Sequence, residues 1–244
     1  MTPRALLSPC VEGAARPKLL DLFCCAGGAA MGYHQAGFDV VGVDVQPQPN
    51  YPFRFVQADA LEYLAAHGRE YDAIHGSPPC QGYAGTRHIV SCAGREYPLL
   101  IAPTIAALRA VGRPWVVENV PGSGLSDLTL CGTMFGLPLR RHRHFAASFL
   151  MLSSGECRHG PADLGVYAGK VTRLGTHAAA YVASSGRTHY RPQTATLAEG
   201  RVAMGIDWMD RHELSQAIPP AYTRFIGEQL MRVVLADRRT GAAA

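Results

Sequence analysis

The sequence predicts an α/β protein with a mostly parallel, doubly wound sheet. Short apolar runs suited to buried strands alternate with helical patterns through about residue 150. The chain has 244 residues and is 48% hydrophobic, enough for one large domain with a small satellite. Because open α/β sheets bind ligands at the carboxyl ends of their strands, we expect functional side chains there.

The elements follow in order along the chain. Strands are expected over 18–23, 38–45, 53–60, 71–76 and 114–122, and helices over 31–37, 61–71, 99–112 and 205–236. Asp210 and Glu213 have the spacing of a capping box, and Thr223 is placed to cap the final helix. We divide the chain into a catalytic domain (1–145), a small irregular target-recognition region (146–200) and C-terminal helices that return to the catalytic domain (201–244).

Charge is concentrated in one part of the chain. The formal net charge is only +4, but residues 140–201 hold nine basic and three acidic side chains. A segment so poor in acids is typical of a surface that faces phosphates, so Arg173 and Arg187 are candidate nucleic-acid contacts.

The seven cysteines indicate a reduced, intracellular chain rather than a disulfide framework. No apolar run reaches the length of a membrane span, and the N-terminal residues do not resemble a signal peptide. Cys157 and His159, with His142 and His144 upstream, suggest part of a metal site. Their spacing matches no standard zinc pattern, so no metal is predicted.

The stretch GSPPCQGY (76–83) places Cys80 directly after two prolines. Proline fixes its own backbone angle and cannot donate to a sheet ladder, so Pro78 and Pro79 end the strand and stiffen the turn after it. A cysteine in the core needs no such support. Cys80 is therefore a candidate nucleophile at the carboxyl edge of the sheet.

A glycine-containing turn, Cys24–Gly28, joins the first strand to a helix. Glycine lets the backbone approach a ligand, and a helix N-terminus favours negative charge. Asp44 ends the second strand, where a carboxylate can bind both hydroxyls of a ribose, and Asp59 follows the third strand within reach of an adenine. These features predict an adenosine-containing cofactor, and the absence of G-x-G-x-x-G argues against NAD.

Glu118 ends an apolar strand, VVEN, so burial is expected to raise its pKa and let it donate a hydrogen bond. Arg141 and Arg143 alternate along a predicted extended segment and should face the same way.

Together these motifs resemble the DNA cytosine-5 methyltransferase family. DLFCCAGG (21–28) is similar to its cofactor loop, SPPCQ (77–81) to its nucleophile motif, ENV (118–120) to its glutamate motif, and Arg141-x-Arg143 to its arginine motif, in the family's order. The resemblance covers about residues 18–145 and 202–232. It implies a Rossmann-like class I methyltransferase fold, S-adenosylmethionine as cofactor and double-stranded DNA as substrate.

The resemblance also implies roles for individual residues. The catalytic set is Cys80, Glu118, Arg141 and Arg143; the cofactor set is Asp21, Phe23, Cys24, Cys25, Gly27, Gly28, Asp44, Asp59 and Pro79; the substrate set is Ser77, Gln81, Arg87, Asn119, Arg173 and Arg187. It implies that Cys80 adds to C6 of a flipped-out cytosine while Glu118 binds the N3 edge and Arg143 the O2 side. A monomer in the cytoplasm of a bacterium or phage-infected host, with a possible cognate restriction enzyme, is the implied setting.

The sequence departs from the family pattern at three places. Cys25 replaces the first glycine of the loop, Leu139 replaces a glutamine, and the last motif, Ser215–Tyr222, lacks its Gly-Asn pair. Four alternatives stay open: a tRNA cytosine methyltransferase, a modifier that uses carboxylated S-adenosylmethionine, an inactive DNA-binding homologue and an enzyme acting on free dCMP.

Overall fold

The computed structural model describes residues 15–83, 97–182 and 188–241. Its largest element is a seven-stranded sheet with the order β3-β2-β1-β4-β5-β7-β6. The strands are β1 (Lys18–Leu22), β2 (Asp39–Asp44), β3 (Arg54–Gln57), β4 (Ala73–Gly76), β5 (Trp115–Asn119), β6 (Leu128–Leu130) and β7 (Arg143–Ala147). The first five pair in parallel, and β7 is antiparallel to both β5 and β6. The mostly parallel sheet is confirmed.

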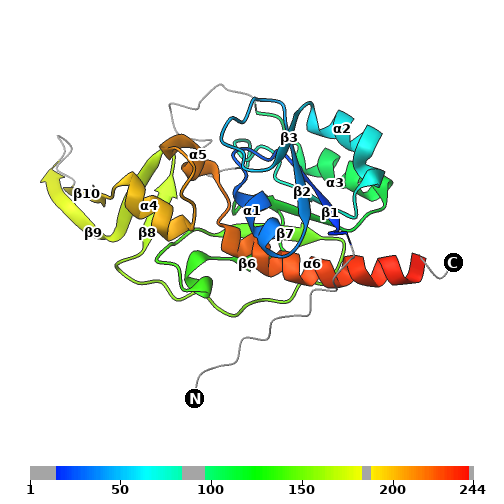
Figure 1. The fold of residues 1–244 in the computed structure, drawn as a ribbon. Coiled ribbons are helices and arrows are strands. Elements are labelled where there is room, and N and C mark those ends of the chain that lie inside the picture. Colours follow the sequence, from blue (N-terminus) through cyan, green and yellow to red (C-terminus); the bar gives the residue numbers. More distant parts are fainter. Residues whose placement is uncertain (1–14, 84–96, 183–187, 242–244) are drawn as a thin grey trace, which may run out of the picture.

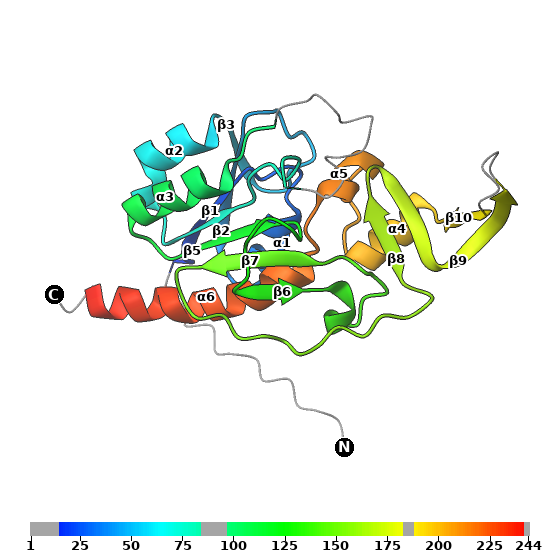
Figure 2. The same ribbon diagram turned by 180° about the vertical axis from the view of Figure 1, so that it is seen from behind.

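Helices cover both faces of this sheet, as Figures 1 and 2 show. On one face lie α1 (Gly28–Gln35) and the long α6 (Pro220–Gly241), whose apolar side chains share a core with Phe38, Phe145 and neighbouring strand residues. On the other lie α2 (Ala60–His67) and α3 (Ile101–Val111), packed on a second core. This part of the chain also contains two short 3-10 helices, η1 (Gly68–Glu70) and η4 (Gly132–Phe135).

The close packing of α1 on α6 depends on a residue without a side chain. A Cβ at Gly32 would lie 2.1 Å from Thr223 Oγ1 and 2.2 Å from Pro220 O, so only glycine fits there. The Thr223 hydroxyl donates to Ala29 O across this contact. The prediction that Thr223 caps α6 is wrong: the helix begins at Pro220, whose fixed φ suits the first turn, and Thr223 lies inside it.

A smaller lobe lies beside the carboxyl edge of the main sheet (Figure 1). It contains an antiparallel sheet of β8 (Leu164–Tyr167), β9 (Lys170–Val182) and β10 (Thr188–Thr194), so the segment expected to be irregular has regular structure. A two-residue turn with positive φ at Ala168 (48°) and Gly169 (70°) joins β8 to β9, the geometry that tight hairpins prefer.

Two further helices belong to the small lobe. α4 (Leu197–Met204) and α5 (Arg211–Gln216) pack on β8 and β9 around a third core that includes Leu164, Val171 and Leu214. The predicted boundary at residue 200 therefore falls inside α4, and only α6 returns to the main sheet. The Asp210–Glu213 capping box predicted at the start of α5 is confirmed.

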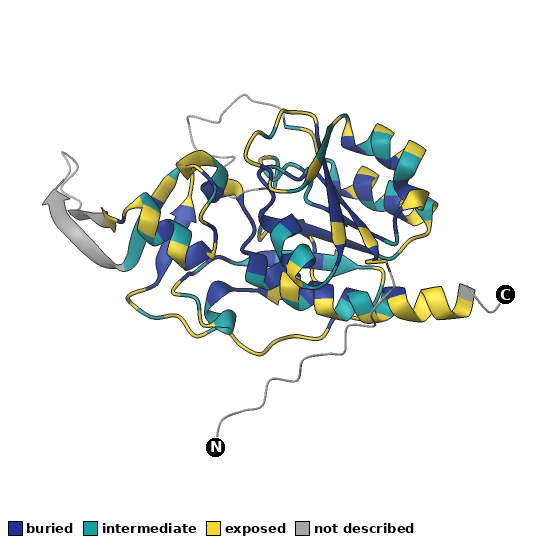
Figure 3. Ribbon diagram, viewed as in Figure 1, coloured by how far each residue is buried: buried dark blue, intermediate teal, exposed yellow. Residues whose placement is uncertain are grey.

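Burial follows this layering (Figure 3): the strands of the main sheet are largely buried, whereas the last turns of α6 are exposed. Within the described part of the chain, no helix combines the length and apolar character that a membrane span requires.

Candidate functional site

The candidate site lies where β1, β2, β4 and β5 end. Because these strands are parallel, their carboxyl ends meet at one edge of the sheet. The turn Cys24–Gly27 follows β1, Asp44 ends β2, the Ser77–Cys80 segment follows β4, and Glu118 and Asn119 end β5. The structure therefore brings together the motifs that the sequence placed on separate strands.

The segment that carries Cys80 is held from both sides. The Ser77 N–H donates to Leu22 O at 3.1 Å, and the Asn119 amide donates to Pro78 O at 2.8 Å. The Tyr83 N–H closes a turn on Cys80 O at 3.0 Å. Asn119, a predicted substrate contact, is buried and uses its side chain to position the cysteine segment. Cys80 itself is half-buried and reachable.

Glu118 and Arg143 form a buried ion pair beside Cys80. Arg143 Nε lies 2.9 Å from Glu118 Oε1, and both side chains are less than a tenth exposed. Burial raises the pKa of Glu118, and Arg143 partly offsets that rise. Burial also raises the pKa of the Cys80 thiol, with Arg143 lowering it and Glu118 raising it further. Of the four predicted catalytic residues, Glu118 and Arg143 are thus close enough to Cys80 to affect the ionisation of its thiol.

Tyr33, His75 and Ser77 form a buried hydrogen-bonded chain that ends at Glu118, and the sequence did not predict this chain. Tyr33 Oη lies 3.0 Å from His75 Nδ1, and His75 Nε2 lies 2.8 Å from Ser77 Oγ. The Ser77 hydroxyl in turn bonds Glu118 and lowers its pKa. Burial lowers the pKa of His75 to about 3, so this imidazole stays neutral. The one signal in the sequence was a histidine inside the otherwise apolar strand AIHG.

Arg141 has a different environment from Arg143. It is fully buried, and its guanidinium donates to three main-chain carbonyls, those of Val166, Ser215 and Ala217. Tyr167 lies against it, with the guanidinium carbon 5.3 Å from the ring centroid. Arg141 thereby joins β8 of the small lobe to the C-terminal end of α5. Arg141 precedes β7 rather than belonging to it, so strand alternation does not relate the two arginines, and their hydrogen-bond partners differ.

The turn after β1 contains several residues with positive φ, a backbone conformation that allows a ligand to approach the main chain closely. Phe23, Cys25 and Gly27 all have positive φ, at 56°, 43° and 82°. Cys25 thus adopts the left-handed conformation that favours glycine, which accounts for the family's glycine at this position. Asp44 fixes the turn, since its carboxylate accepts from the N–H groups of Cys25 (3.1 Å) and Gln46 (2.9 Å).

Asp21 lies buried beneath this turn. Its Oδ2 is 3.5 Å from the Tyr51 hydroxyl, while its Oδ1 has no hydrogen-bond partner in the structure. Burial, together with the charge of Asp44, raises the pKa of Asp21 to about 8. An unpartnered buried carboxyl oxygen next to a second carboxylate suits a ligand that carries positive charge. S-adenosylmethionine, with its sulfonium and ammonium groups, meets that requirement.

The other predicted cofactor residues surround the same turn. Cys24 is buried, Gly28 begins α1, and a Cβ on Gly28 would lie 2.5 Å from Ile218 O. The Ser215–Tyr222 motif therefore packs against the start of α1 although it has no Gly-Asn pair.

Asp59 is exposed and caps α2, with its Oδ1 accepting from Leu61 N (2.9 Å) and Glu62 N (3.0 Å). This leaves Oδ2 for a ligand. Pro79 precedes the half-buried Cys80.

The predicted nucleic-acid contacts are less uniform. Gln81 is exposed next to Cys80, as a substrate contact requires. Arg173 forms an ion pair with Glu199, so part of its charge is already neutralised. Arg87 and Arg187 lie outside the described residues.

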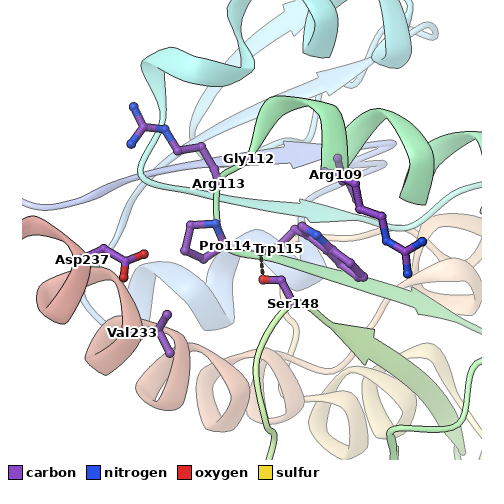
Figure 4. A pocket seen from close by; sticks show the side chains of 9 residues that line it. Arg109, Gly112, Arg113, Pro114, Trp115, Ser148, Val233 and Asp237 are labelled. Atoms are coloured by element: carbon purple, nitrogen blue, oxygen red, sulfur yellow. Dashed lines mark hydrogen bonds between the residues drawn. The ribbon is translucent and has the colours of Figure 1, made fainter. Parts of the chain in front are cut away.

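A pocket at the opposite end of β5 is distinct from this site (Figure 4). It is lined by Leu108, Arg109, Gly112, Arg113, Pro114, Trp115, Ser148, Val233 and Asp237. Trp115 begins β5 and its N–H donates to Ser148 Oγ at 2.9 Å, whereas Glu118 and Asn119 end the strand. None of the predicted site residues lines this pocket.

Comparison with solved structures defines the class of fold. A putative DNA modification methyltransferase encoded within an Escherichia coli prophage matches with a TM-score of 0.59 and 15% identity, covering 90% of this chain and 99% of that one. Schizosaccharomyces pombe Dnmt2 methyltransferase gives a TM-score of 0.59 at 13% identity, with the same coverage. The chain therefore has the Rossmann-like methyltransferase fold predicted from its sequence.

Sequence comparison gives a narrower likeness. No protein-family model matches the chain. Type II methyltransferase M.XorII of Xanthomonas oryzae is 38% identical over an alignment of 85 residues, and the match covers 28% of this chain and 20% of that relative. M.AgeI of Thalassovita gelatinovora is 31% identical over an alignment of 83 residues, and the match covers 28% of this chain and 19% of that relative. The match thus spans about a fifth of each relative's length. The resemblance to methyltransferases drawn from the motifs is confirmed.

Proposed function

We propose that the protein transfers a methyl group from S-adenosylmethionine to C5 of cytosine in DNA. The observation that carries the proposal is the cluster of Cys80 with the buried Glu118–Arg143 pair, at the same sheet edge as the Cys24–Gly28 turn. Burial raises the pKa of the Cys25 thiol in that turn, and the nearby charges of Asp44, Asp21, Cys80 and Glu118 raise it further. The nucleophile and the cofactor turn are therefore neighbours.

Cytosine C5 is too poor a nucleophile to take a methyl group directly. In the proposed mechanism the Cys80 thiolate forms a bond to C6, which moves electron density to C5 and makes it enamine-like. C5 then gains the methyl group and loses its proton, and the Cys80–C6 bond breaks to restore the aromatic ring. When bound, S-adenosylmethionine supplies the electrophilic methyl group.

Glu118 and Arg143 act on the base in this mechanism. A carboxyl group whose pKa is raised by burial can hydrogen-bond the N3 and amino edge of cytosine and favour electron flow into the ring. Arg143 holds Glu118 in place through Nε and has further N–H donors for the O2 side. Ser77, bonded to His75 and Glu118, positions the carboxyl group rather than the base.

The cofactor is held by the chain's own polar groups. Asp44 would hold the ribose hydroxyls, Oδ2 of Asp59 would accept from the adenine amino group, and Phe23 would contribute to the adenine pocket. The buried Asp21 carboxyl faces the positively charged end. In duplex DNA the target base must leave the helix, at a cost of a few kcal/mol, and the small lobe would contact the flanking duplex.

The first experiment uses duplex DNA that contains 5-fluorocytosine. Fluorine cannot leave C5 as a proton does, so a productive enzyme with S-adenosylmethionine becomes trapped through Cys80. We expect a covalent band on a denaturing gel that Cys80→Ser abolishes. Cys10→Ser, which removes a cysteine outside every motif, is the matched control and should trap normally.

Three results would contradict the proposal. Trapping that survives Cys80→Ser would place the nucleophile elsewhere. No trapping on DNA of varied sequence, with cofactor binding shown by calorimetry, would favour an inactive homologue. Trapping on tRNA carrying 5-fluorocytosine, but not on DNA, would favour the RNA alternative.

A further inference from the structure

Four metal-binding side chains meet beside the catalytic sheet, outside the site described above. They are Cys131, His142, Cys157 and His159, and their ligating atoms all lie within 4.8 Å of one another. Cys131 follows β6, His142 immediately precedes β7, and the other two lie in the segment between β7 and β8. Two cysteines and two histidines form one of the common ligand sets of structural zinc.

The spacing of these atoms fits tetrahedral coordination. Cys131 Sγ lies 3.4 Å from His159 Nε2, and Cys157 Sγ lies 3.5 Å from His142 Nε2. Bond lengths of about 2.3 Å for Zn–S and 2.0–2.1 Å for Zn–N, at a tetrahedral angle, place sulfur and nitrogen about 3.6 Å apart. The ring centroids of His142 and His159 are 5.0 Å apart, and the ring planes are nearly perpendicular, at 80°. The two rings therefore approach the cluster from different directions.

The surroundings favour a metal over four unliganded groups. The Thr133 hydroxyl lies 3.6 Å from Cys131 Sγ and donates to it, the kind of outer contact that stabilises a metal-bound thiolate. Zn²⁺ with two thiolates has no net charge, which suits a site next to Arg141 and Arg143. Cys131 is buried, His142 and Cys157 are half-buried, and His159 is exposed, so an ion can enter from solvent.

The sequence pattern grouped His144 with His142, Cys157 and His159 and did not include Cys131. In the structure, His144 Nδ1 lies 3.0 Å from Leu125 O, in the loop before β6. The antiparallel pairing of β6 with β7 brings Cys131 next to His142 instead.

We propose that Cys131, His142, Cys157 and His159 bind one Zn²⁺ as a closed structural site. The metal would fasten the segment between Ala147 and Leu164, which contains no helix or strand, to the end of the catalytic sheet. His142 lies between Arg141 and Arg143, so the same ion anchors the chain that carries both arginines. A metal can add to the limited apolar packing of this segment, which rests on Phe149 and Met151.

The test is the metal content of untagged protein purified without chelator. We expect roughly one Zn²⁺ per chain. Cys157→Ser and His159→Asn should each lose it, and because His159 is exposed, its replacement should leave the fold intact. His144→Asn is the matched control and should retain the metal. Thr133→Val should bind Zn²⁺ about tenfold more weakly, since it removes only the outer contact.

Cobalt provides a second measurement. Protein refolded with Co²⁺ should show the visible bands of a tetrahedral site and the ultraviolet band of thiolate ligands, and Cys157→Ser should lose both. Metal-free protein with no cobalt bands, a disulfide between Cys131 and Cys157 found by mass spectrometry, or zinc retained in Cys157→Ser would each overturn the proposal.

Discussion

Arg143 Nε lies 2.9 Å from Glu118 Oε1, in a pair that joins the start of β7 to the end of β5. Both side chains are buried, so each charge depends on the other to offset its loss of hydration. The same pair acts on Cys80 in opposite directions, because the arginine lowers the pKa of the thiol and the glutamate raises it. The pKa of the Cys80 thiol is thus adjusted by two opposite charges that are hydrogen-bonded to each other.

The first prediction concerns the reactivity of Cys80. Glu118→Gln removes a negative charge and should lower the pKa of the thiol, whereas Arg143→Gln removes a positive charge and should raise it. The pH dependence of alkylation at Cys80, followed by peptide mass spectrometry, reports both. Shifts in the same direction would mean that burial, rather than charge, dominates both variants.

The second prediction concerns Arg141. Replacing it with methionine leaves the carbonyls of Val166, Ser215 and Ala217 without their buried donor. We expect a loss of about 3–5 kcal/mol in the free energy of unfolding, measured with urea. Arg140→Met is the control, since that side chain is partly exposed and 3.9 Å from Asp163, and it should cost less than about 1 kcal/mol. Equal losses would refute a special role for Arg141.

The third prediction concerns Asp21 and pH. Its pKa in the folded protein is about 8, against 3.8 for an ordinary aspartate. A raised pKa means that the folded state favours the protonated form, so stability is fully present below pH 3.8 and is lost as the pH rises through about 8.

Asp21→Asn cannot titrate and should escape this loss. Without cofactor, its stability relative to the unmodified protein should increase steadily between pH 4 and pH 8. Urea unfolding across this range measures the gap. A gap that does not change with pH would show that the Asp21 carboxyl titrates normally.

The fourth prediction concerns the cofactor. Asp44→Ala should weaken S-adenosylmethionine binding by tenfold or more, because it removes the proposed ribose contact and frees the Cys25 and Gln46 N–H groups. Calorimetry provides the affinity. Asp39→Ala, an exposed acid at the start of the same strand, should bind normally. Unchanged affinity in Asp44→Ala would remove that residue from the cofactor site.

The fifth prediction concerns DNA. If Arg173 contacts a phosphate, Arg173→Gln should reduce the slope of log affinity against log salt by about 1. Its pairing with Glu199 suggests a counter-variant: Glu199→Gln should free the arginine and tighten binding. Fluorescence anisotropy at several salt concentrations tests both. An unchanged slope in Arg173→Gln would assign that residue to the ion pair alone.

Local pattern was enough to predict the parallel sheet, the glycine-containing turn after β1 and the positions of Cys80, Glu118 and Asp44. Each of these depends on a run of apolar residues followed by a polar group, and parallel strands necessarily bring their carboxyl ends together. The small lobe was harder to predict, because residues 146–200 are rich in Gly, Ser, Thr, His and Arg between short apolar runs. Its strands depend on pairing with one another and on packing against α4 and α5.

Tertiary structure alone decided which side chains meet across the sheet and between the lobes. The sequence determined that Arg141 and Arg143 lie close together, but only the fold turned Arg143 toward Glu118 and Arg141 toward three carbonyls of other segments. The same holds for His75 between Tyr33 and Ser77, and for Cys131 beside His159. Contacts between residues far apart in the chain leave no periodicity for sequence analysis to detect.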